Sequence, residues 1–488
     1  METLNSVERV NKIPEIIQGG MGVGVSDWCL AGEVAGDGGL GIVSGTAADV
    51  VMARRLQDGD VDGAMRYALE HFPDQKIANK IINDYYLPDG RRLNQPYKNV
   101  PMTTFKPYDL GLVEDLNMAA AFAEVWLAKN LASTSGRQPG MVGINLLTKL
   151  QLPTFSALYG AMLADVDCVV MGAGIPKDIP QAIENIANRQ PAKTKFYVTG
   201  SGVENEIVFD PAKYPEIENN NEKPAFLAIV ASNALAERLS RSHIDSIKAD
   251  GLVIEGPTAG GHNAPARDKG FDERDQPIYG DRDKVIIEKI IKLGLPFWLA
   301  GGYGTPEGLM DAKKQGANGI QAGSVFALCE ESGIDPLLRE QLIRQILDGD
   351  MNILTSSKAS PTGFPFKVVE GLSQDRKRRL CDLGGLREPY VCEAAGGLER
   401  IDYRCPAEPE SRYVSKNGNI ERTLGSLCLC NGLLSTIGLG QIYNDEKEKP
   451  KPIVTLGDQT PEVVRRLVGR YGLRFSAVNV MDFLRGKE

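Results

Sequence analysis

The sequence predicts an α/β protein built as a TIM (β/α)8 barrel with insertions, and three observations support this fold class. Eight short apolar segments lie between residues 13 and 321, helix-like stretches separate them, and several are followed directly by glycines. Short, nearly continuous apolar runs are typical of strands that are buried on both faces of a parallel sheet. Eight such strands alternating with helices favour a closed barrel.

The eight predicted strands are bounded by turn-forming residues. They span residues 13–18, 39–43, 141–146, 168–171, 226–230, 251–255, 297–300 and 319–321. A doubly wound sheet, which also has parallel strands, is the alternative. Its glycine fingerprint usually follows the first strand as G-x-G-x-x-G, whereas Gln18-Gly19-Gly20-Met21-Gly22 follows the first strand here.

The spacing of the strands predicts two long insertions and a C-terminal subdomain. The barrel would occupy residues 1–335, with surface insertions at about 46–140 and 188–224. Residues 336–488 would form a mainly helical subdomain packed on the barrel, with helices at 336–347 and 460–471. We expect Thr460 to cap the second helix and Pro461 to be its first residue.

Composition excludes several classes of function. The chain has 488 residues, of which 42% are hydrophobic and 24% charged, as in ordinary globular proteins. The net charge of −9 gives no electrostatic basis for binding nucleic acid or an anionic membrane surface. No stretch approaches the ~18 apolar residues of a membrane span, and the N-terminus does not resemble a signal peptide.

Cysteine usage indicates the compartment and argues against a metal. Eight cysteines spread over a chain of this length do not form a disulfide framework, so we expect a cytoplasmic protein. The later cysteines are Cys381, Cys392, Cys405, Cys428 and Cys430. Their closest pair is Cys-Leu-Cys, with no histidine beyond His262, which is poor spacing for zinc. We expect no metal site and reduced thiols instead.

Two glycine-rich loops predict a phosphate site. Gly301, Gly302 and Gly304 follow the seventh strand, and Thr305 and Pro306 then suit the start of a helix. The eighth strand continues into Gln321, Gly323 and Ser324. Free N–H groups at a glycine-rich helix start bind phosphate through geometry and dipole. In TIM barrels the loops after strands seven and eight commonly form this site, although ordinary turns are the alternative.

The loop after the sixth strand predicts a catalytic residue. It runs Glu255-Gly256-Pro257-Thr258-Ala259-Gly260-Gly261-His262. Histidine is the side chain best suited to moving protons near neutral pH, and catalytic residues of barrels gather at strand ends. The alternative is a histidine that only hydrogen-bonds a loop or ligand. His71 and His243 lie in charged, helix-like contexts and are expected at the surface.

Taken together, these motifs resemble the nitronate monooxygenase (2-nitropropane dioxygenase) family. The matching stretches run from residue 13 to about 335, with gaps at the two insertions. They are IPEIIQGGMGVGVS, GINLL, EGPTAGGHNAP, AGGYGTPEG and IQAGSVFALCEE.

The resemblance implies FMN bound at the mouth of the barrel. Gly20, Met21 and Gly22 would line the isoalloxazine, and Asn145 would offer it a polar side chain. The other cofactor-binding residues expected are Glu255, Gly260, Gly261, Gly301, Gly302, Gly304, Gln321, Gly323 and Ser324, several of them around the phosphate. His262 would remove the α-proton of a neutral nitroalkane and orient an already anionic nitronate.

Two departures from the short members of the family concern the substrate. Glu255 stands where short members often have glutamine. Residues 360–367 (SPTGFPFK) and the cysteine-rich tail are absent from short members. They resemble a longer branch related to the flavin enoyl reductase subunits of polyunsaturated fatty acid and polyketide synthases. Lys358 and Lys367 flank the first seven residues of that segment, SPTGFPF; we expect both lysines to be exposed, although either could reach an anionic ligand.

The preferred function is oxidation of alkyl nitronates by FMN and O2. One alternative is an NAD(P)H-dependent enoyl reductase on the same barrel. The other is a flavin-binding subunit of a larger complex without its own turnover. The expected partners are a small nitronate or enoyl-type substrate and O2. A homodimer is a possible assembly of the protein. The intact His262 loop favours a self-sufficient enzyme, and the long C-terminal third favours the alternatives.

Overall fold

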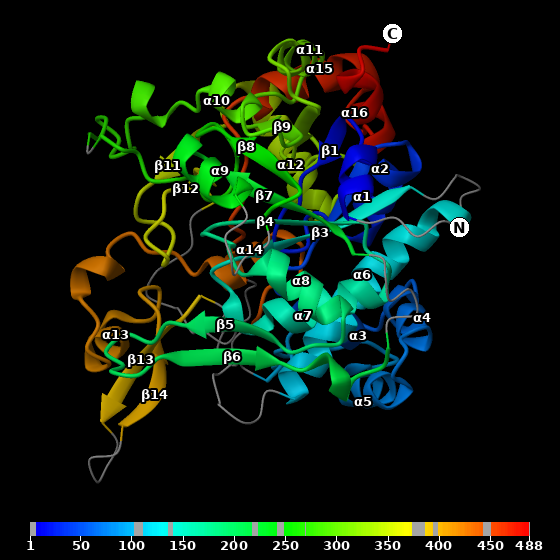
Figure 1. Ribbon diagram of the computed structural model, residues 1–488, viewed down its shortest axis with the longest axis vertical. Coiled ribbons are helices and arrows are strands. Elements are labelled where there is room, and N and C mark those ends of the chain that lie inside the picture. Colours follow the sequence, from blue (N-terminus) through cyan, green and yellow to red (C-terminus); the bar gives the residue numbers. More distant parts are fainter. Residues whose placement is uncertain are drawn as a thin grey trace.

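The computed structural model describes residues 6–101, 111–134, 140–216, 223–241, 248–268, 270–372, 386–393, 399–442 and 450–487. Eight parallel strands close into a TIM barrel in the spatial order β1-β10-β9-β8-β7-β4-β3-β2 (Figure 1). The barrel strands are β1 (Ile16–Gln18), β2 (Leu40–Ser44), β3 (Met141–Leu147), β4 (Cys168–Gly172), β7 (Ala225–Val230), β8 (Gly251–Glu255), β9 (Phe297–Ala300) and β10 (Gly319–Ala322). Each of the eight predicted segments contributes one strand, and closure excludes the doubly wound sheet.

The barrel interior is a packed apolar cluster. Ile42, Leu227 and Trp298 are fully buried within it, one from each of three strands. Val10 and Ile13, which flank the end of α1 (Ser6–Lys12), belong to the same cluster. The chain before β1 therefore closes the amino-terminal end of the barrel. The carboxyl ends of the strands are left to form the functional site, as in TIM barrels generally.

A ring of helices covers the barrel. Between successive barrel strands lie α2 (Trp28–Gly36), α3 (Ala48–Gln57), α4 (Ala64–Glu70), α5 (Gln75–Tyr85), α6 (Gly111–Thr134), α7 (Gln151–Leu163), α8 (Ile179–Ala187), α9 (Asn233–Ser240), α10 (Ile287–Ile291) and α11 (Pro306–Lys314). The segment 46–140 is more than a surface insertion, because α6 packs between α2 and α7. Met118 and Ala121 on α6 are fully buried.

The second long connection forms a hairpin outside the barrel. Its strands, β5 (Ala192–Phe196) and β6 (Asn205–Phe209), pair with each other in antiparallel register. A further antiparallel pair, β13 (Glu388–Glu393) and β14 (Glu399–Arg404), lies beside it (Figure 1). A parallel bridge between Thr199 and Tyr390 joins the two pairs. The insertion at 188–224 is thus tied to the C-terminal third.

The C-terminal third is packed against the barrel helices. Its other elements are α12 (Pro336–Asp348), β11 (Ile353–Ser356), β12 (Phe366–Val369), α13 (Glu410–Ser415), α14 (Leu429–Thr436), α15 (Thr460–Tyr471) and α16 (Ala477–Leu484). Helix α16 contacts α2 and α11, and α15 contacts α12. Leu342, Val464 and Met481 belong to the same apolar core as the helices around the barrel. The C-terminal third, predicted to be mainly helical, also contains the antiparallel strand pairs β11–β12 and β13–β14. None of the described helices is both long and apolar enough to cross a membrane.

The start of α15 corrects one prediction. Thr460 is not its N-cap; Gln459 holds that position and makes no side-chain cap. The Thr460 hydroxyl instead donates to the carbonyl of Gly457 at 2.7 Å. This hydrogen bond closes the turn 455–459 that precedes the helix. Pro461 is the second residue of the helix, one position later than predicted, and still lies in its first turn.

Lys367 corrects a second prediction. Its side chain is only 2% exposed, and Nζ lies 2.6 Å from the Asp458 carboxylate. Nζ also donates to the Thr355 hydroxyl at 2.7 Å. A buried ammonium requires such partners, so Lys367 joins β12 to the turn before α15. Lys358 is exposed as expected and pairs with Asp275. His71 is exposed, and His243 lies outside the described residues.

Because Lys367 is buried, we expect removal of its ion-pair partner, Asp458, to destabilise the fold measurably. Asp458→Asn leaves the Lys367 ammonium without its carboxylate, and we expect it to cost about 1–3 kcal/mol, less than a fully buried pair because Asp458 is partly exposed. Glu15→Gln removes the partner of Lys313 in an exposed pair, so it should cost under about 1 kcal/mol. Apparent unfolding midpoints in urea compare the two variants. Equal midpoints would show that the buried ion pair has no special role.

Candidate active site

One cavity at the carboxyl ends of the barrel strands brings the predicted site residues together. Its volume is about 410 Å³, within the range of about 300–1,000 Å³ typical of ligand sites. It is lined by Gly20, Met21, Gly22, Asn145, Glu255, Gly260, Gly261, His262, Gly301, Gly302, Gly304, Gln321, Gly323 and Ser324, with further residues described below. These residues come from five barrel strands and their loops, and they meet because parallel strands end at one mouth. Their individual roles stay predictions.

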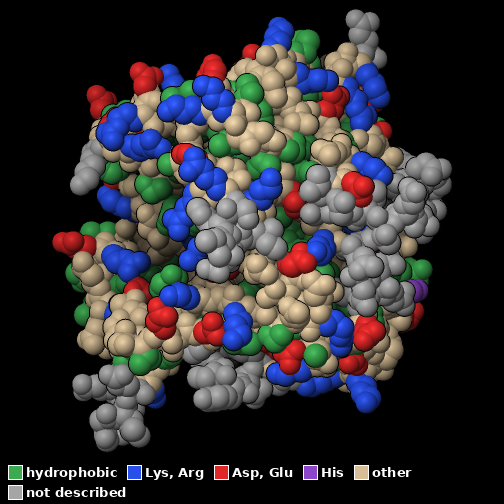
Figure 2. Space-filling model, in the orientation of Figure 1, with side chains coloured by type: hydrophobic (Ala, Val, Ile, Leu, Met, Phe, Trp, Pro, Cys, Tyr) green, Lys and Arg blue, Asp and Glu red, His purple; other side chains and the backbone are tan. Residues whose placement is uncertain are grey.

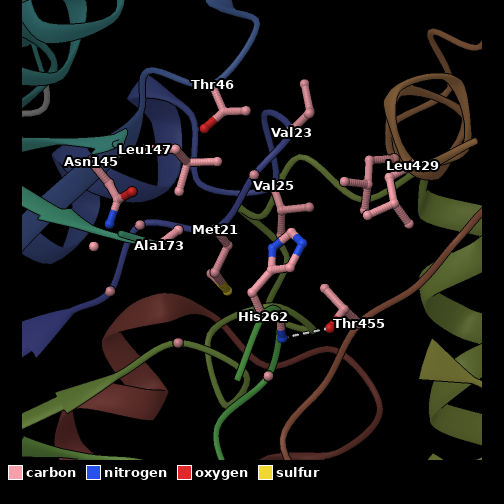
Figure 3. Close-up of a pocket in the computed structure, with 18 of the residues that line it drawn as sticks. Met21, Val23, Val25, Thr46, Asn145, Leu147, Ala173, His262, Leu429 and Thr455 are labelled. Carbon is pink, nitrogen blue, oxygen red and sulfur yellow. Dashed lines mark hydrogen bonds between the residues drawn. The ribbon is translucent and has the colours of Figure 1, made fainter. Parts of the chain in front are cut away.

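The glycines after β1 allow a close approach to β3, which lies on the other side of β2 in the barrel. A side chain on Gly20 would place its Cβ 2.3 Å from Cβ of Asn145. At Gly22 the nearest atom would be Cβ of Thr46 at 3.3 Å. Gly20 is therefore required for Asn145, at the end of β3, to sit where it does. Met21 and Asn145 both face the cavity (Figure 3).

The loops after β9 and β10 form a concave surface rich in backbone N–H groups. Gly301 and Gly302 have φ angles of +76° and +92°, in the left-handed region that favours glycine. Thr305 caps α11, as predicted, by accepting a hydrogen bond from the N–H of Gly308 at 2.9 Å. The Gln321 side-chain oxygen is buried and has no hydrogen-bond partner among the described residues. This surface can hold a ligand that bears phosphate and hydrogen-bond donors.

A turn from the C-terminal third completes this surface. The N–H of Gly457 donates to the Ser324 hydroxyl at 2.8 Å. The Thr455 hydroxyl accepts from the N–H of Gly261 at 2.6 Å, the contact drawn in Figure 3. Gln459 also lines the cavity. The C-terminal third is therefore part of the site.

His262 is held by the segment that follows β11. Its Nε2 lies 2.7 Å from the Ser360 hydroxyl and 3.4 Å from that of Thr362. Its ring packs edge-on against Phe366 at 4.8 Å between centroids. The backbone on either side is also fixed, because Lys367 N–H donates to the Gly261 carbonyl at 3.0 Å and Asn263 N–H donates to the Pro365 carbonyl at 2.9 Å. The ring extends into the cavity that Met21 and Val25 also line (Figure 3).

Lys149 is a second basic group in the same cavity. It follows β3, and its Nζ donates to the Thr362 hydroxyl at 3.3 Å. Nζ also lies 3.2 Å from the centre of the Phe364 ring, a cation–π geometry. Burial lowers the pKa of Lys149 to about 7. Burial and the nearby Lys149 ammonium together lower the pKa of His262 to about 3, so the imidazole is neutral near pH 7.

Glu255 is an acidic residue of the cavity and the first residue of the segment that leads to His262. It ends β8, and burial raises the pKa of its carboxyl to about 7. Among the described residues, no side chain pairs with its carboxylate. A carboxyl group in this state is partly neutral at physiological pH, so it can either donate or accept a hydrogen bond. The charge near a bound ligand therefore depends on pH.

Sequence reasoning missed several residues that the fold brings to the site. These are Lys149, Thr258, Ser360, Thr362, Thr455 and Gln459. For Lys149 a signal was present, since it directly follows a predicted strand, where barrels place functional groups. For Ser360 and Thr362 the signal was the SPTGFPFK segment itself. Nothing in the sequence pointed to Thr455 or Gln459.

The cysteines of the C-terminal third are partly gathered. Cys405 and Cys428 are buried and pack in one small cluster with Ala407. Within the described residues, no group of three or more His, Cys, Asp or Glu side chains is placed to hold a metal ion. Cys381 lies outside the described residues.

The fold and the cavity define a TIM-barrel protein with a ligand site at the mouth of the barrel. Residues 186–362 match the family model described as nitronate monooxygenase, so the resemblance predicted from the sequence is confirmed over that segment. A nitronate monooxygenase of Pseudomonas aeruginosa is 26% identical over 157 residues, which cover 32% of this chain and 42% of the relative. The aligned part thus spans less than half of that relative.

Solved structures with a similar course of the chain include three proteins. FabK from Thermotoga maritima has 14% identity and a TM-score of 0.47, covering 100% of this chain and 96% of its own. Nitroalkane oxidase from Streptomyces ansochromogenes has 13% identity and a TM-score of 0.45, covering 98% and 96%. The enoyl reductase domain of MlnA from Bacillus amyloliquefaciens has 11% identity and a TM-score of 0.46, covering 99% and 97%. They add nothing to what the barrel topology already shows.

The contact between Gly20 and Asn145 predicts a difference between two neighbouring glycines. Gly20→Ala must displace the start of the Asn145 side chain, and overpacking of this kind typically costs about 1–3 kcal/mol. Gly22→Ala meets its neighbour at a tolerable distance and should cost about half as much or less. Apparent unfolding midpoints of the two variants provide the test. A Gly20→Ala variant as stable as the Gly22→Ala variant would contradict the described packing.

Proposed function

We propose that the protein is an FMN-dependent oxidoreductase that oxidises alkyl nitronates with O2. One observation carries this proposal. All residues predicted to bind the flavin and its phosphate, together with His262, line a single cavity at the barrel mouth. The family match over residues 186–362 supports the same activity class.

The described residues fit FMN on three counts. The buried oxygen of Gln321 lacks a partner and can accept a hydrogen bond from a ring N–H. Gly20 allows the Asn145 side chain to approach the backbone after β1, and from there Asn145 faces the cavity, where it can bond a polar edge of the ring. Gly301, Gly302 and the capped start of α11 present N–H groups to one phosphate. The one G-x-G-x-x-G match, residues 36–41, runs from the end of α2 into β2 and does not join a strand to a following helix. It therefore lacks the context of a pyrophosphate-binding loop, which favours FMN over FAD.

The proposed role of His262 is that of a general base. Its low pKa keeps the imidazole unprotonated at neutral pH. When Nε2–H donates to Ser360, the lone pair resides on Nδ1, which has no partner among the described residues. Nδ1 then accepts the α-proton of a neutral nitroalkane, while a nitronate has already lost that proton. Bound FMN supplies the electron acceptor, and O2 completes the oxidation.

The second candidate is an NAD(P)H-dependent enoyl reductase. The observation that favours it is the contact between Ser360 and His262. The SPTGFPFK segment, which resembles the longer branch, is thereby part of the site. In that reaction a proton is supplied to the α-carbon of the substrate, so His262 would serve as a proton donor. A flavin-binding subunit of a larger complex remains the third candidate.

The phosphate site predicts that Gly302→Ala weakens FMN binding by about tenfold or more, because a side chain there fills the space the phosphate would approach. Its Cβ would lie 3.2 Å from the Thr258 hydroxyl. Gly349→Ala is the matched control. Gly349 also has a positive φ, at the end of α12, but nothing lies within 4 Å of its Cβ position.

The measurement is flavin content per folded chain, with the released cofactor identified by mass. Wild type and Gly349→Ala should release FMN in equal amounts. Full flavin occupancy in the Gly302→Ala variant would mean that the phosphate binds elsewhere, and release of FAD would contradict the proposed cofactor.

The general-base role predicts that His262→Asn separates two substrates. A positioned base typically contributes about 10²–10⁴-fold. Turnover of a neutral nitroalkane should therefore fall by about that factor, while turnover of the corresponding nitronate falls much less. Stopped-flow flavin reduction with each donor under anaerobic conditions measures both. His71→Asn, at an exposed histidine, is the control.

Equal losses for nitroalkane and nitronate would show that His262 binds the anion and does not move a proton. In the enoyl reductase alternative, His262→Asn would slow enoyl reduction and leave flavin reduction by NAD(P)H largely intact.

A further inference from the structure

A chain of hydrogen bonds leads from His262 to Lys149. His262 Nε2 lies 2.7 Å from the Ser360 hydroxyl, which lies 2.7 Å from the Thr362 hydroxyl. The Thr362 hydroxyl lies 3.3 Å from Lys149 Nζ. Both hydroxyl groups belong to the segment after β11, whereas His262 follows β8 and Lys149 follows β3. Three separate parts of the chain therefore supply one continuous polar path.

Lys149 stands between two cavities. It lines the cavity that holds His262, and it also lines a second cavity of about 400 Å³. The second cavity lies beside α8 and β5, with Lys177, Asp178 and Thr194 in its wall. Lys and Arg side chains gather on this face over the region of α9 and β5 (Figure 2). The chain of hydrogen bonds thus ends at Lys149, which lines both cavities.

We propose that Ser360, Thr362 and Lys149 form a proton relay that carries protons from His262 to the second cavity. This inference rests on the proposed function, in which His262 takes the α-proton of a neutral nitroalkane. It adds the route by which His262 returns to its neutral form in each turnover.

The proton balance of the relay is simple. Nδ1 of His262 gains the substrate proton, and Nε2 gives its own proton to the Ser360 oxygen. The Ser360 hydroxyl passes its proton to Thr362, and Thr362 passes its proton to the neutral amine of Lys149. The resulting ammonium releases one proton to water in the second cavity. The imidazole is then neutral with its proton on Nδ1, and tautomerisation of the ring, with rotation of the two hydroxyl groups, restores the starting state. No oxidant or reductant takes part in these steps.

The relay requires a neutral Lys149. An ammonium has three donors and no acceptor, so it can only donate to Thr362. The hydroxyl groups then cannot donate toward Lys149, as the relay requires. A neutral amine accepts from Thr362 and lets each hydroxyl donate toward it. Because burial lowers the pKa of Lys149 to about 7, the neutral form is available near physiological pH. A proton on His262, whose pKa is about 3, moves downhill to this amine.

Other charged groups share the two cavities with Lys149. Asp49, Glu255 and Arg387 line the first cavity. Lys177, Asp178, Lys195 and Arg238 line the second. Lys195 is paired with Glu204. The pKa of Lys149 is lowered by burial alone, so these groups do not set it.

The kinetic test uses variants along the path in the FMN-loaded protein. In the wild type, kcat/KM for a neutral nitroalkane should rise with pH through about 7, as the amine of Lys149 becomes neutral. Lys149→Met and Thr362→Val should lose this dependence and fall about tenfold or more, whereas Thr362→Ser should keep both. Nitronate turnover should fall much less than nitroalkane turnover in every variant, because no proton is removed from a nitronate. Lys177→Met, in the wall of the second cavity, is the matched control for loss of a positive charge.

Chemical rescue separates proton transfer from packing. Added methylamine should restore nitroalkane turnover in Lys149→Ala in proportion to the concentration of free amine, since a small base can occupy the space left by the side chain. A purely structural role for Lys149 predicts no such dependence. Unchanged nitroalkane kinetics in Lys149→Met would overturn the relay.

A second measurement does not depend on turnover. The chain has three histidines, so a protein labelled with ¹³C at the imidazole Cε1 gives few signals, and His262→Asn assigns the one of interest. Between pH 6 and 9 the His262 signal should shift with a midpoint near 7, reporting Lys149 through the two hydroxyl groups. The shift should vanish in Lys149→Met and in Thr362→Val.

The outcomes distinguish the relay from the proposed function. A wild type that oxidises neither substrate contradicts the proposed function, and the histidine signal then decides whether the polar path operates. A wild type that oxidises both, with a His262 signal that titrates unchanged in Lys149→Met, contradicts the relay alone.

Discussion

Closure of eight parallel strands is the constraint on which the site depends. Because every strand runs in the same direction, every carboxyl end opens onto one mouth, and loops far apart in sequence must converge there. The barrel interior and the chain before β1 fill the opposite end with apolar side chains. The mouth is therefore the place where backbone N–H groups and polar side chains stay available. Gly20, Asn145, His262 and Gln321 meet only as a result of this closure.

The C-terminal third adds a second layer of constraint over the mouth. Residues 360–367 hold the His262 loop from one side, and the turn 455–459 holds it from the other. The buried ion pair between Lys367 and Asp458 links these two segments. A histidine fixed in this way loses little conformational entropy when it presents one nitrogen in a defined direction, and this arrangement suits proton transfer. The same segments carry the polar path toward Lys149.

Much of the barrel could be predicted from sequence, because buried parallel strands leave a local signature of short apolar runs. The glycine loops and the Thr305 cap were predictable for the same reason, since their demands are local. The burial of Lys367 could not be predicted, because a lysine is usually solvated and its carboxylate partner, Asp458, lies about ninety residues further along the chain. Ser360 and Thr455 were also missed, since their roles depend on contacts between segments about a hundred residues or more apart. The prediction that Thr460 caps α15 was wrong because its hydroxyl donates to the Gly457 carbonyl.

The most direct test of the proposed function is an anaerobic titration of the purified, flavin-loaded protein, first with an alkyl nitronate and then with NADH and NADPH. The visible spectrum of the flavin reports its reduction by each donor. The proposed function predicts that the nitronate reduces the flavin and that the nicotinamide nucleotides do not. Rapid reduction by NADH or NADPH, with no response to any nitronate, would contradict it and favour the enoyl reductase.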